Sequence, residues 1–580
     1  MQDTCLIYDA PTQTLQRFNN PLRVISCDRI ERLLDCLSEV EQAFQQGKFA
    51  AGFVCYEAAS AFDEAFATHP LDSFPLLRFC IYDACETIPF SPDKSAVEPC
   101  GPWYPSIDKA DYLRHAGEIK SLIREGETYQ VNYTFKLKAS FQNDPESFFL
   151  AMQKQLKAEY AACITFDHWA ICSFSPELFF TLENETLISK PMKGTIARGM
   201  TLENDQEQKQ RLALSEKDRA ENVMITDMIR NDMGQIADPG SVGVSRVCEV
   251  DRHTYVWQMT STVSATTPAS LPEIFKALFP CSSITGAPKV NTTRIIRELE
   301  PEARGIYTGA IGLVRPGGNA RFNVAIRTLL INRDNNSAEY GVGSGIVWDS
   351  DPEQEYRECL LKAEFLTRME PDFDLLESML WSRDDGYHLL EEHLQRLGRS
   401  ARYFGFPFDK TEVRQALDRF HTTIEAQQSK IRLLLDRTGR IQLEAGPLGG
   451  VKTSCLKMGL AKEAIDSTCR FLYHKTTWRE IYQKAASSRP DCDDAVLWNE
   501  RGEITETCRS NIVINLDGKR LTPPVHCGLL PGTFREYLLR SGDIQEAVIS
   551  KAMLQNCQAL YTINSVRGWM NAVLIDKDLP

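Results

Sequence analysis

Apolar residues recur at two spacings along the chain, and together they predict a mixed α/β protein. The segment from Arg29 to Gln46 carries them at helical spacing. Short apolar runs such as Cys5 to Asp9, Ala51 to Glu57 and Leu76 to Asp83 are typical of strands. These patterns therefore predict that the N-terminal part is a structural scaffold, and it contains no recognisable catalytic motif.

A helix predicted from Asp108 to Arg124 is followed by a strand from Thr128 to Tyr133. Gln130 and Asn132 share one face of that strand. Polar side chains within a strand need partners if they are buried. This face is therefore either exposed to solvent or part of a site.

A second predicted helix, Ser215 to Asp232, carries an acidic residue on its apolar side. Ser215 is a candidate N-cap. Glu221 shares a helical face with Ile225 and Met228. A carboxylate in such a place is costly unless it is paired or holds a metal. Both readings, a structural salt bridge and a metal ligand, stay open on pattern alone.

A lysine stands in a tight turn between a strand-like run and a charged segment, in the sequence Pro191-Met-Lys-Gly-Thr195. We interpret Lys193 as a nucleophile. A lysine serves covalent chemistry only if desolvation or a nearby cation lowers its pKa, and a turn bracketed by Pro and Gly can hold it at the floor of a cleft. A lone turn lysine would more often be a solvated surface residue, so the other motifs decide.

The apolar pattern breaks at a proline in the acidic segment Thr367 to Asp374. Beyond it, a strand is predicted from Leu375 to Trp381 and a helix from Leu389 to Tyr403. The 580 residues are too many for one core. We therefore predict two domains, residues 1-368 and 372-580.

The formal net charge of −14 and the absence of a basic stripe argue against nucleic acid or an anionic membrane as the main partner. The 18 cysteines show no metal-ligand spacing, and no apolar run is long enough to span a membrane. These features predict free thiols in a reducing cytoplasm and a small-molecule substrate.

Acidic and basic residues converge near the end of the first domain. Glu355, Glu358 and Lys362 fall on one face of a predicted helix. The carboxylates of this helix, together with that of Glu221, suit Mg2+, which takes one or two protein carboxylates and keeps places for substrate oxygens and water. The glycine run Gly341 to Val347 lets backbone N–H groups approach an anion closely.

Eight ordered blocks make the first domain resemble the chorismate-binding enzymes, and among them component I of aminodeoxychorismate synthase. The blocks are TYQVN, SPELFF, PMKGT, KDRAENVMITDMIRND, SITGAPK, AIRTL, GSGIV and EYRECLLK. The resemblance implies an antiparallel-sheet α/β (α+β) domain around a cleft, like anthranilate synthase component I. It also implies Mg2+ held by Glu221 and Glu358 with Glu355 nearby, and a chorismate site made by Gln130, Thr285, Arg327, Gly343, Ser344, Gly345 and Lys362.

The lysine turn separates relatives within that family. Anthranilate synthases carry alanine where this chain has Lys193, and ammonia then attacks C2 of chorismate. A lysine can itself attack C2, so that ammonia adds at C4. Isochorismate synthases place a lysine base where this chain has Gln130, which cannot act as a base. One departure is Gln258, which stands near the place of a family histidine. No glutaminase signature is present, so we expect ammonia from a separate glutamine amidotransferase subunit.

A second constellation in residues 372-580 suits pyridoxal 5'-phosphate. Such a site needs a Schiff-base lysine, an acid at the pyridine nitrogen and an anion cradle for the phosphate. Lys475, Glu506 and the turn at Gly532 and Thr533, which precedes a helix, supply the three. Arg396 offers a further phosphate contact.

This half resembles the fold-type IV pyridoxal phosphate enzymes, which include aminodeoxychorismate lyases and class IV aminotransferases. The resemblance implies a cofactor contact at Asn564 and leaves room for a homodimer through this domain. It does not separate lyase from aminotransferase, although Ser378 stands where lyases keep a hydroxyl proton donor. The phosphate turn departs from the family pattern, because its hydroxyl at Thr533 is displaced by one position.

The fusion favours one combined function, the synthesis of 4-aminobenzoate from chorismate for folate. A first domain that makes 4-amino-4-deoxychorismate feeds a lyase that removes pyruvate. Two alternatives remain: an anthranilate synthase-like enzyme fused to a branched-chain or D-amino acid aminotransferase, and a C-terminal half that is a non-catalytic scaffold.

Overall fold

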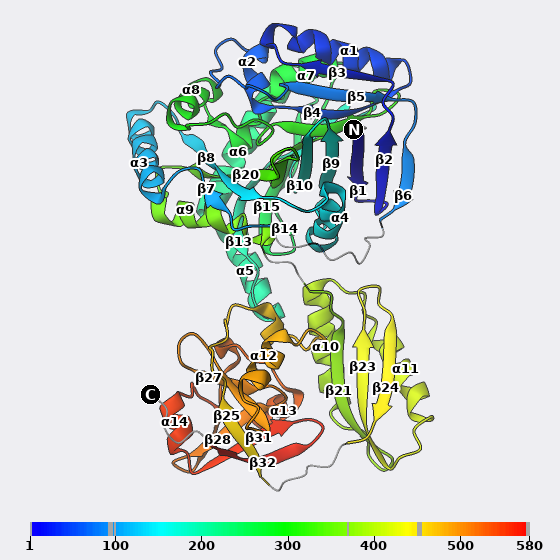
Figure 1. Cartoon of the computed structure of the whole chain (residues 1–580), viewed down its shortest axis with the longest axis vertical. Helices are drawn as coiled ribbons and strands as arrows, with labels where there is room; N and C mark the ends of the chain where they lie inside the picture. The colour runs from blue at the N-terminus through cyan, green and yellow to red at the C-terminus, as the bar shows by residue number, and fades with distance from the viewer. Residues whose placement is uncertain (1–2, 91–96, 98–99, 368–370, 449–454, 576–580) are drawn as a thin grey trace. The chain divides into compact units, whose positions relative to one another are not determined.

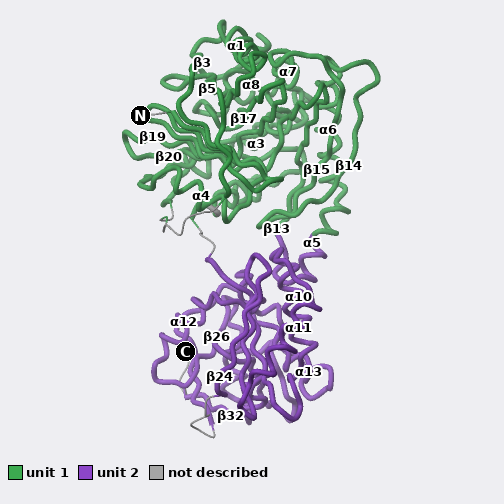
Figure 2. The backbone as a smooth tube through the Cα atoms, turned by 90° about the vertical axis from the view of Figure 1, so that its right-hand side faces the viewer, with its two compact units in different colours: residues 1–197, 209–370 green, residues 198–208, 371–580 purple. Residues whose placement is uncertain are grey.

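The structure, a computed structural model, describes residues 3–90, 97, 100–367, 371–448 and 455–575. Two compact units make up the chain (Figures 1 and 2). Unit 1 comprises Met1–Ala197 and Lys209–Glu370, and unit 2 comprises Arg198–Gln208 and Pro371–Pro580. None of the helices in the described residues has the length and apolarity needed to cross a membrane.

Unit 1 contains two ten-stranded antiparallel sheets. The order of the first is β16 (Gly286–Ala287), β8 (Gln130–Ser140), β20 (Ser337–Ile346), β19 (Thr328–Asn332), β10 (Trp169–Ser175), β9 (Tyr160–Phe166), β1 (Thr4–Asp9), β2 (Thr14–Asn19) and β6 (Glu86–Pro89), with β7 (Tyr104–Pro105) on β8. The order of the second is β13 (Met192–Ala197), β15 (Val256–Thr266), β12 (Thr186–Lys190), β11 (Leu178–Glu183), β18 (Ala320–Val324), β17 (Ala310–Val314), β4 (Phe49–Val54), β5 (Leu77–Tyr82) and β3 (Arg23–Cys27), with β14 (Gly243–Arg252) on β15.

The two sheets of unit 1 pack face to face, with helices on both outer sides (Figure 1). Side chains alternate along each strand, so each sheet turns one apolar face to its partner and the other to helices. Phe18, Phe53 and Ile164 lie in the core between the sheets. The helices on the first sheet are α3 (Lys109–Glu125), α4 (Pro145–Leu156), α8 (Lys289–Leu299) and α9 (Pro352–Leu361); those on the second are α1 (Leu33–Gln45), α2 (Ala59–Phe62), α6 (Glu216–Gly234) and α7 (Leu271–Leu278).

The helices predicted from periodicity are present, with local differences at their ends. Ser215 caps α6 as predicted, because its side chain accepts a hydrogen bond from the N–H of Asp218. The predicted start at Arg29 is early, since Ile30–Arg32 forms a 3-10 turn before α1. No disulfide joins any of the 18 cysteines.

Unit 2 combines a small sheet with a barrel. The small antiparallel sheet has the order β22 (Gly386–Tyr387), β21 (Leu375–Ser382), β23 (Gln428–Leu435) and β24 (Ile441–Gly446), and α10 (Leu390–Phe404) and α11 (Lys410–His421) cover one face. The larger mixed sheet has the order β27 (Ile504–Thr507), β26 (Asp494–Trp498), β25 (Leu456–Leu460), β32 (Gly568–Leu574), β31 (Ala559–Asn564), β28 (Asn511–Leu516), β29 (Lys519–Thr522) and β30 (Gln545–Glu546). Pairing of Glu506 with Asn511 joins β27 to β28 and closes six of these strands into a ring.

Residues Arg198–Gln208, where α5 (Leu202–Leu214) begins, belong to unit 2 by their contacts. The Arg198 guanidinium pairs with the Asp205 carboxylate through two 2.6 Å hydrogen bonds. It also donates to the carbonyl of Tyr403 at 3.0 Å, while the Tyr403 hydroxyl donates to the carbonyl of Gly199 at 2.8 Å. The ring of His474 contacts the carbonyl of Met200 at 3.1 Å. Unit 2 therefore includes a segment taken from the middle of the first half of the sequence.

Candidate active sites

The predicted tight turn is a kink within a strand, because Lys193 is the second residue of β13 and the pairing with β15 shifts between Met192 and Thr195. We call this kink the lysine turn. Burial lowers the pKa of the Lys193 ammonium group. Gly194 follows with φ +88°, and a Cβ at that position would lie 2.9 Å from Cβ of Asp218. Glycine is therefore required both for the turn and for the close approach of α6. The lowered pKa is what a nucleophilic lysine needs.

Gln258, on β15, hydrogen-bonds to the lysine turn. Its Oε1 accepts a 2.8 Å hydrogen bond from the Thr195 hydroxyl, and its Nε2 donates to the carbonyl of Gly194 at 3.0 Å. Asn222 of α6 donates to the carbonyl of Lys193 at 3.5 Å. The Gln258 side chain thus holds the backbone of the turn and carries no titratable proton.

Carboxylates from α6 and α9 lie close to Lys193. Burial lowers the pKa of Lys193, and the negative charges of Glu221 and Glu358 partly oppose that effect. Burial raises the pKa of Glu221, and the charge of Glu355 raises it further. Glu221 forms no ion pair with any residue of the described part of the chain, so the salt-bridge reading finds no support there. Glu355 accepts a hydrogen bond from the Ser344 hydroxyl.

These carboxylates fit a hard divalent cation only in part. The described residues contain no ready-made group of three or more His, Cys, Asp or Glu side chains placed to hold a metal. Mg2+ rarely uses such a cage, because one or two carboxylates suffice when substrate oxygens and water complete its shell. Glu221 and Glu358, on two helices that flank one lysine, offer that donor set.

Two further predicted site residues of unit 1, Arg327 and Gln130, are buried polar groups, and the place of Arg327 in the site stays a prediction. Burial lowers the pKa of Arg327, and none of the acidic side chains in the described residues pairs with it. Gln130 is 1% exposed, yet neither of its amide atoms has a hydrogen-bond partner among the described residues. A Cβ on Gly345 would lie 2.2 Å from Nε2 of Gln130 and 3.1 Å from Nζ of Lys193. Buried groups left without partners in this way suggest a site for a polar, anionic ligand.

The remaining predicted residues lie near this site. Lys362 donates to the carbonyl of Gly343 at 2.9 Å, which places its ammonium beside the glycine run. The Thr285 hydroxyl donates to the carbonyl of Cys281 at 2.9 Å, so this group already serves the local turn. The role of Thr285 in binding stays a prediction.

Glu177, in the SPELFF block, was not singled out from the sequence. It is 2% exposed and accepts a 2.6 Å hydrogen bond from the Ser283 hydroxyl. Burial raises the pKa of its carboxyl to about 7, against a smaller opposing effect of Lys193. An acidic residue within an otherwise apolar strand-like run was the available signal.

In unit 2, Lys475 lies beside the start of β21, where its carbonyl accepts from the N–H of Leu376 at 2.9 Å. Burial, and after it the charge of Arg396, lower the pKa of Lys475 to about 8. A lysine with this pKa is a competent amine nucleophile near neutral pH.

Glu506 on β27 is buried, and burial raises its pKa to about 7. Its Oε1 accepts from the Tyr482 hydroxyl at 2.8 Å and from the N–H of Leu530 at 3.2 Å, and its Oε2 accepts from Asn511 at 3.4 Å. These three donors fix the orientation of the carboxylate. Tyr482 and Asn511 were not predicted from the sequence, because both come from elements that only the barrel brings together.

The predicted phosphate turn opens α13 (Thr533–Ser541), with Gly532 as N-cap and no side chain satisfying the first N–H groups. A Cβ on Gly532 would lie 2.0 Å from Oδ1 of Asn511. The hydroxyl oxygen of Thr533 lies 3.3 Å from Nε2 of His393. Free N–H groups, a hydroxyl and a close glycine fit a phosphate, and with Lys475 they fit pyridoxal phosphate.

Arg396 is held by other groups of unit 2. Its guanidinium donates to both oxygens of Glu377, at 2.9 and 2.6 Å, and to the carbonyl of Pro531 at 3.1 Å. It therefore braces the turn before α13, and a direct phosphate contact stays a prediction.

Ser378 lies on β21 of the small sheet and Asn564 ends β31 of the barrel, and Ser565 links the two. The Ser378 carbonyl accepts from the Ser565 hydroxyl at 3.3 Å. Asn564 donates to the Ser510 hydroxyl at 2.9 Å, and its Oδ1 accepts from the N–H of Val566 and Arg567. Asn564 thus shapes two loops next to Glu506, and its contact with a cofactor stays a prediction.

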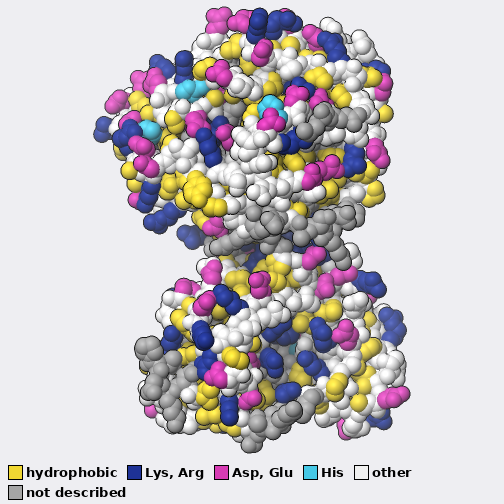
Figure 3. Space-filling model, viewed as in Figure 1, with side chains coloured by type: hydrophobic (Ala, Val, Ile, Leu, Met, Phe, Trp, Pro, Cys, Tyr) yellow, Lys and Arg dark blue, Asp and Glu magenta, His cyan; other side chains and the backbone are white. Residues whose placement is uncertain are grey.

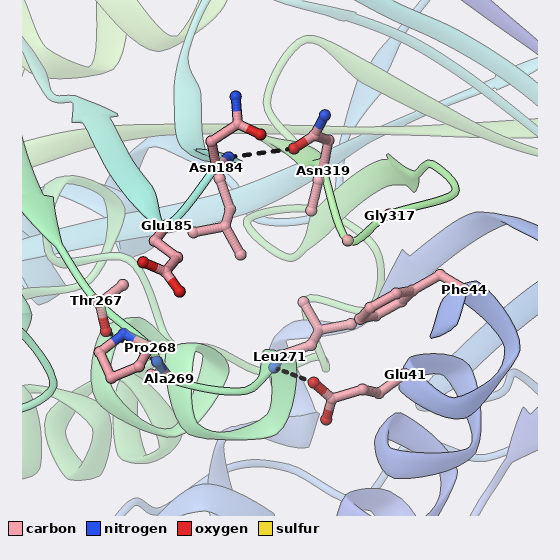
Figure 4. A pocket seen from close by; sticks show the side chains of 13 residues that line it. Glu41, Phe44, Asn184, Glu185, Thr267, Pro268, Ala269, Leu271, Gly317 and Asn319 are labelled. Carbon is pink, nitrogen blue, oxygen red and sulfur yellow. Dashed lines mark hydrogen bonds between the residues drawn. The ribbon is translucent and has the colours of Figure 1, made fainter. Parts of the chain in front are cut away.

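A surface cavity of unit 1 contains none of the predicted site residues (Figure 4). The side chains of Glu41, Phe44, Glu185 and Asn319 line it, and Glu41 Oε1 accepts from the N–H of Leu271 at 3.4 Å. It is separate from the lysine-centred site.

Two lysine-centred sites, one beside an antiparallel double sheet and one at a small barrel, define an enzyme with two chemistries. Residues 3–368 match the family model described as chorismate binding enzyme, and residues 374–575 match that of amino-transferase class IV. The chain belongs to the chorismate binding enzyme family, with a class IV amino-transferase domain in its second half. The family resemblance read from the sequence motifs is confirmed.

Among relatives, a probable aminodeoxychorismate synthase from Oryza sativa subsp. japonica is 41% identical over 267 residues, 45% of this chain and 30% of the relative. Aminodeoxychorismate synthase component 1 of Klebsiella aerogenes is 38% identical over 262 residues, 45% of this chain and 58% of the relative. The match thus covers less than two thirds of either relative. A solved anthranilate synthase component I from Streptococcus pneumoniae TIGR4 aligns with TM-score 0.53 and 25% identity, covering 63% of this chain and 92% of that chain.

Proposed function

We propose that unit 1 converts chorismate and ammonia into 4-amino-4-deoxychorismate and water. The observation that carries this proposal is Lys193, a lysine of lowered pKa with Glu177 and Glu221 around it. Its free amine attacks C2, both ring double bonds shift by one position, and the C4 hydroxyl departs. Ammonia then adds at C4, both double bonds shift back, and the Lys193 amine leaves.

The surrounding residues suit these steps. Arg327, a buried cation without an acidic partner among the described residues, can pair with a substrate carboxylate. Glu177, protonated below pH about 7, can give the C4 hydroxyl the proton that it needs to leave as water. Glu221 and Glu358 would hold Mg2+, which, when bound, supplies positive charge for the substrate oxygens.

We propose that unit 2 then releases pyruvate and leaves 4-aminobenzoate. Pyridoxal phosphate, when bound, supplies the electron sink for this elimination. Lys475 takes the proton from C4 as the bond between C3 and the ether oxygen breaks, and the ring becomes aromatic. The Ser378 hydroxyl, on the same side of β21, is a candidate to protonate the departing group. Glu506, oriented by Tyr482, would face the pyridine nitrogen.

The ammonia source belongs to the same proposal. The Klebsiella relative is named a component 1, which supports a second component that releases ammonia from glutamine. We expect that component to be a separate amidotransferase chain. A homodimer through unit 2 is a further expectation, which sedimentation of the purified chain would test.

The test is product analysis on the purified chain with chorismate, Mg2+ and ammonium salt. Without pyridoxal phosphate we expect 4-amino-4-deoxychorismate to accumulate; with it we expect 4-aminobenzoate and pyruvate in equal amounts. Anthranilate as the main product would overturn the role of unit 1. Accumulation that pyridoxal phosphate leaves unchanged would overturn the role of unit 2.

A further inference from the structure

One face of the small sheet in unit 2 carries basic side chains. Met379 of β21 and Ile431 of β23 pack under α10 and α11. Because side chains alternate along a strand, Lys430 and Arg432 of β23 point to the opposite face, together with Ser378, which pairs with Arg432. The N–H of Leu376 bonds to the carbonyl of Lys475 beside this face.

Three arginines reach the same place from loops of the barrel. Arg479 follows Lys475 by four residues, Arg509 lies in the turn between β27 and β28, and Arg567 lies in the turn between β31 and β32. Those two turns are joined by the hydrogen bond from Asn564 to Ser510 and are tied to β21 by the bond from Ser565 to the Ser378 carbonyl. We call the set of Lys430, Arg432, Arg479, Arg509 and Arg567 the basic rim.

The members of the basic rim lie close enough to repel one another. The pKa of Lys430 is lowered by burial and then by Arg432, Arg567, Arg509 and Arg479. Arg432 pairs with Glu444 at 3.3 Å. Lys430, Arg479 and Arg509 form no ion pair with an acidic side chain in the part of the chain that the structure describes. Figure 3 shows Lys and Arg side chains around a hollow on one face of unit 2.

Crowded cations destabilise each other unless an anion joins them. The Arg479 guanidinium also lies over the Tyr482 ring, at 4.3 Å from its centroid, and the Tyr482 hydroxyl reaches Glu506. The basic rim is thus adjacent to Glu506 and to the backbone of Lys475, the residues expected to hold the cofactor.

We propose that the basic rim binds the two carboxylates of the substrate of unit 2 and selects a dicarboxylate over an ordinary amino acid. The inference rests on the proposed function, since 4-amino-4-deoxychorismate carries one carboxylate on the ring and one on the enolpyruvyl group. Lys430, Arg479 and Arg509, which form no ion pair with the described acidic residues, can share two carboxylates, whereas a monocarboxylate would meet only part of that charge. Arginine guanidinium groups pair with carboxylates through two parallel hydrogen bonds, which also fixes the ring orientation.

The first test compares Lys430→Met and Arg509→Met in the full holoenzyme with the parent. Each variant should raise the KM for 4-amino-4-deoxychorismate about tenfold or more, the effect of one charged hydrogen bond. The kcat should stay within about twofold, because neither residue touches the reacting atoms. The cofactor absorbance should be unchanged. Lys462→Met and Lys519→Met, exposed lysines of the same unit, are the charge-matched controls.

The second test uses isophthalate and benzoate as dicarboxylate and monocarboxylate probes, with the change in cofactor absorbance as the readout. The parent should bind isophthalate more tightly at low salt, and Lys430→Met/Arg509→Met should lose that preference. A parent that discriminates isophthalate but releases no pyruvate would overturn the lyase assignment and keep the rim as a dicarboxylate site. Pyruvate release with unchanged KM in both variants, or equal binding of the two probes by the parent, would overturn the basic rim.

Discussion

Nζ of Lys362 lies 2.8 Å from Oε1 of Glu358, one helical turn away on the same face. The pair lowers the pKa of Glu358 and raises that of Lys362, so both groups stay charged. A metal that takes Glu358 as a ligand must share that carboxylate with Lys362, which in turn can reach a substrate carboxylate.

Glu358→Gln and Glu221→Gln should each lower Mg2+-dependent amination about 100-fold or more, since even outer partners of a metal contribute up to that much. The measurement is initial rate against Mg2+ concentration. Glu353→Gln on the same helix, whose partner Lys109 is exposed, is the control. Unchanged Mg2+ dependence in Glu221→Gln, with lower thermal stability, would return Glu221 to a structural role.

Lys193→Ala should lose C4 amination by about 10⁴-fold or more, as expected for removal of a covalent nucleophile. Products of attack by ammonia at C2 should appear instead, because the alanine side chain leaves C2 of chorismate accessible to ammonia. Chromatography of the products formed from chorismate and ammonium salt checks both statements. Lys190→Ala, three residues earlier at the end of β12, is the matched control. Full C4 amination by Lys193→Ala would refute covalent attack.

Glu177→Gln should remove a pH effect as well as activity. The folded pKa of about 7 lies above the ordinary carboxyl value, so Glu177 is protonated below pH about 7 and ionised above it. As the proton donor it should give the parent a rate that falls as pH rises through 7. The variant should be slower by about 10²-fold and lack that limb. Glu183→Gln, at the end of β11, the strand that begins directly after Glu177, should keep the parental profile.

Lys475→Ala should still aminate chorismate while 4-amino-4-deoxychorismate accumulates, because the substitution leaves unit 1 intact. Lys484→Ala, at an exposed lysine of α12 (Glu480–Ser488), should behave as the parent. The parental apoenzyme should capture pyridoxal phosphate more slowly as pH falls through about 8, since Lys475 then gains a proton. Stopped-flow absorbance against pH measures this; a midpoint near 10.5 would mean an unperturbed lysine.

Asp205→Asn should destabilise unit 2. Removing one member of a buried ion pair leaves the other unpaired and costs about 3–5 kcal/mol. Arg198 and Asp205 side chains are 6% and 1% exposed, so solvent cannot compensate. The temperature at which bound cofactor is released reports on this unit, and Glu207→Gln in the same helix is the control. An unchanged release temperature would show that the pair adds nothing.

The sequence predicts the elements and the two lysines better than it predicts their neighbours. Periodicity placed α6, α9 and α10, and motif order indicated which residues would gather around Lys193. The sequence did not identify Glu177, Tyr482 and Glu377 as site residues, because the role of each depends on partners far along the chain. Strand pairing and barrel closure bring these partners together, and periodicity contains no information about which strands pair. Gln258 was noticed only as a departure, and its two hydrogen bonds to the lysine turn explain it.

The excursion of residues 198–208 into unit 2 means that the chain passes between the units three times, at 197/198, 208/209 and 370/371. An end-to-end joining of two independent genes would need one passage. A stop codon or protease cut near residue 370 would therefore not regenerate two whole enzymes, because the C-terminal fragment would lack the segment that meets Tyr403 and His474. Unit 2 is consequently complete only in a chain that also contains residues 198–208.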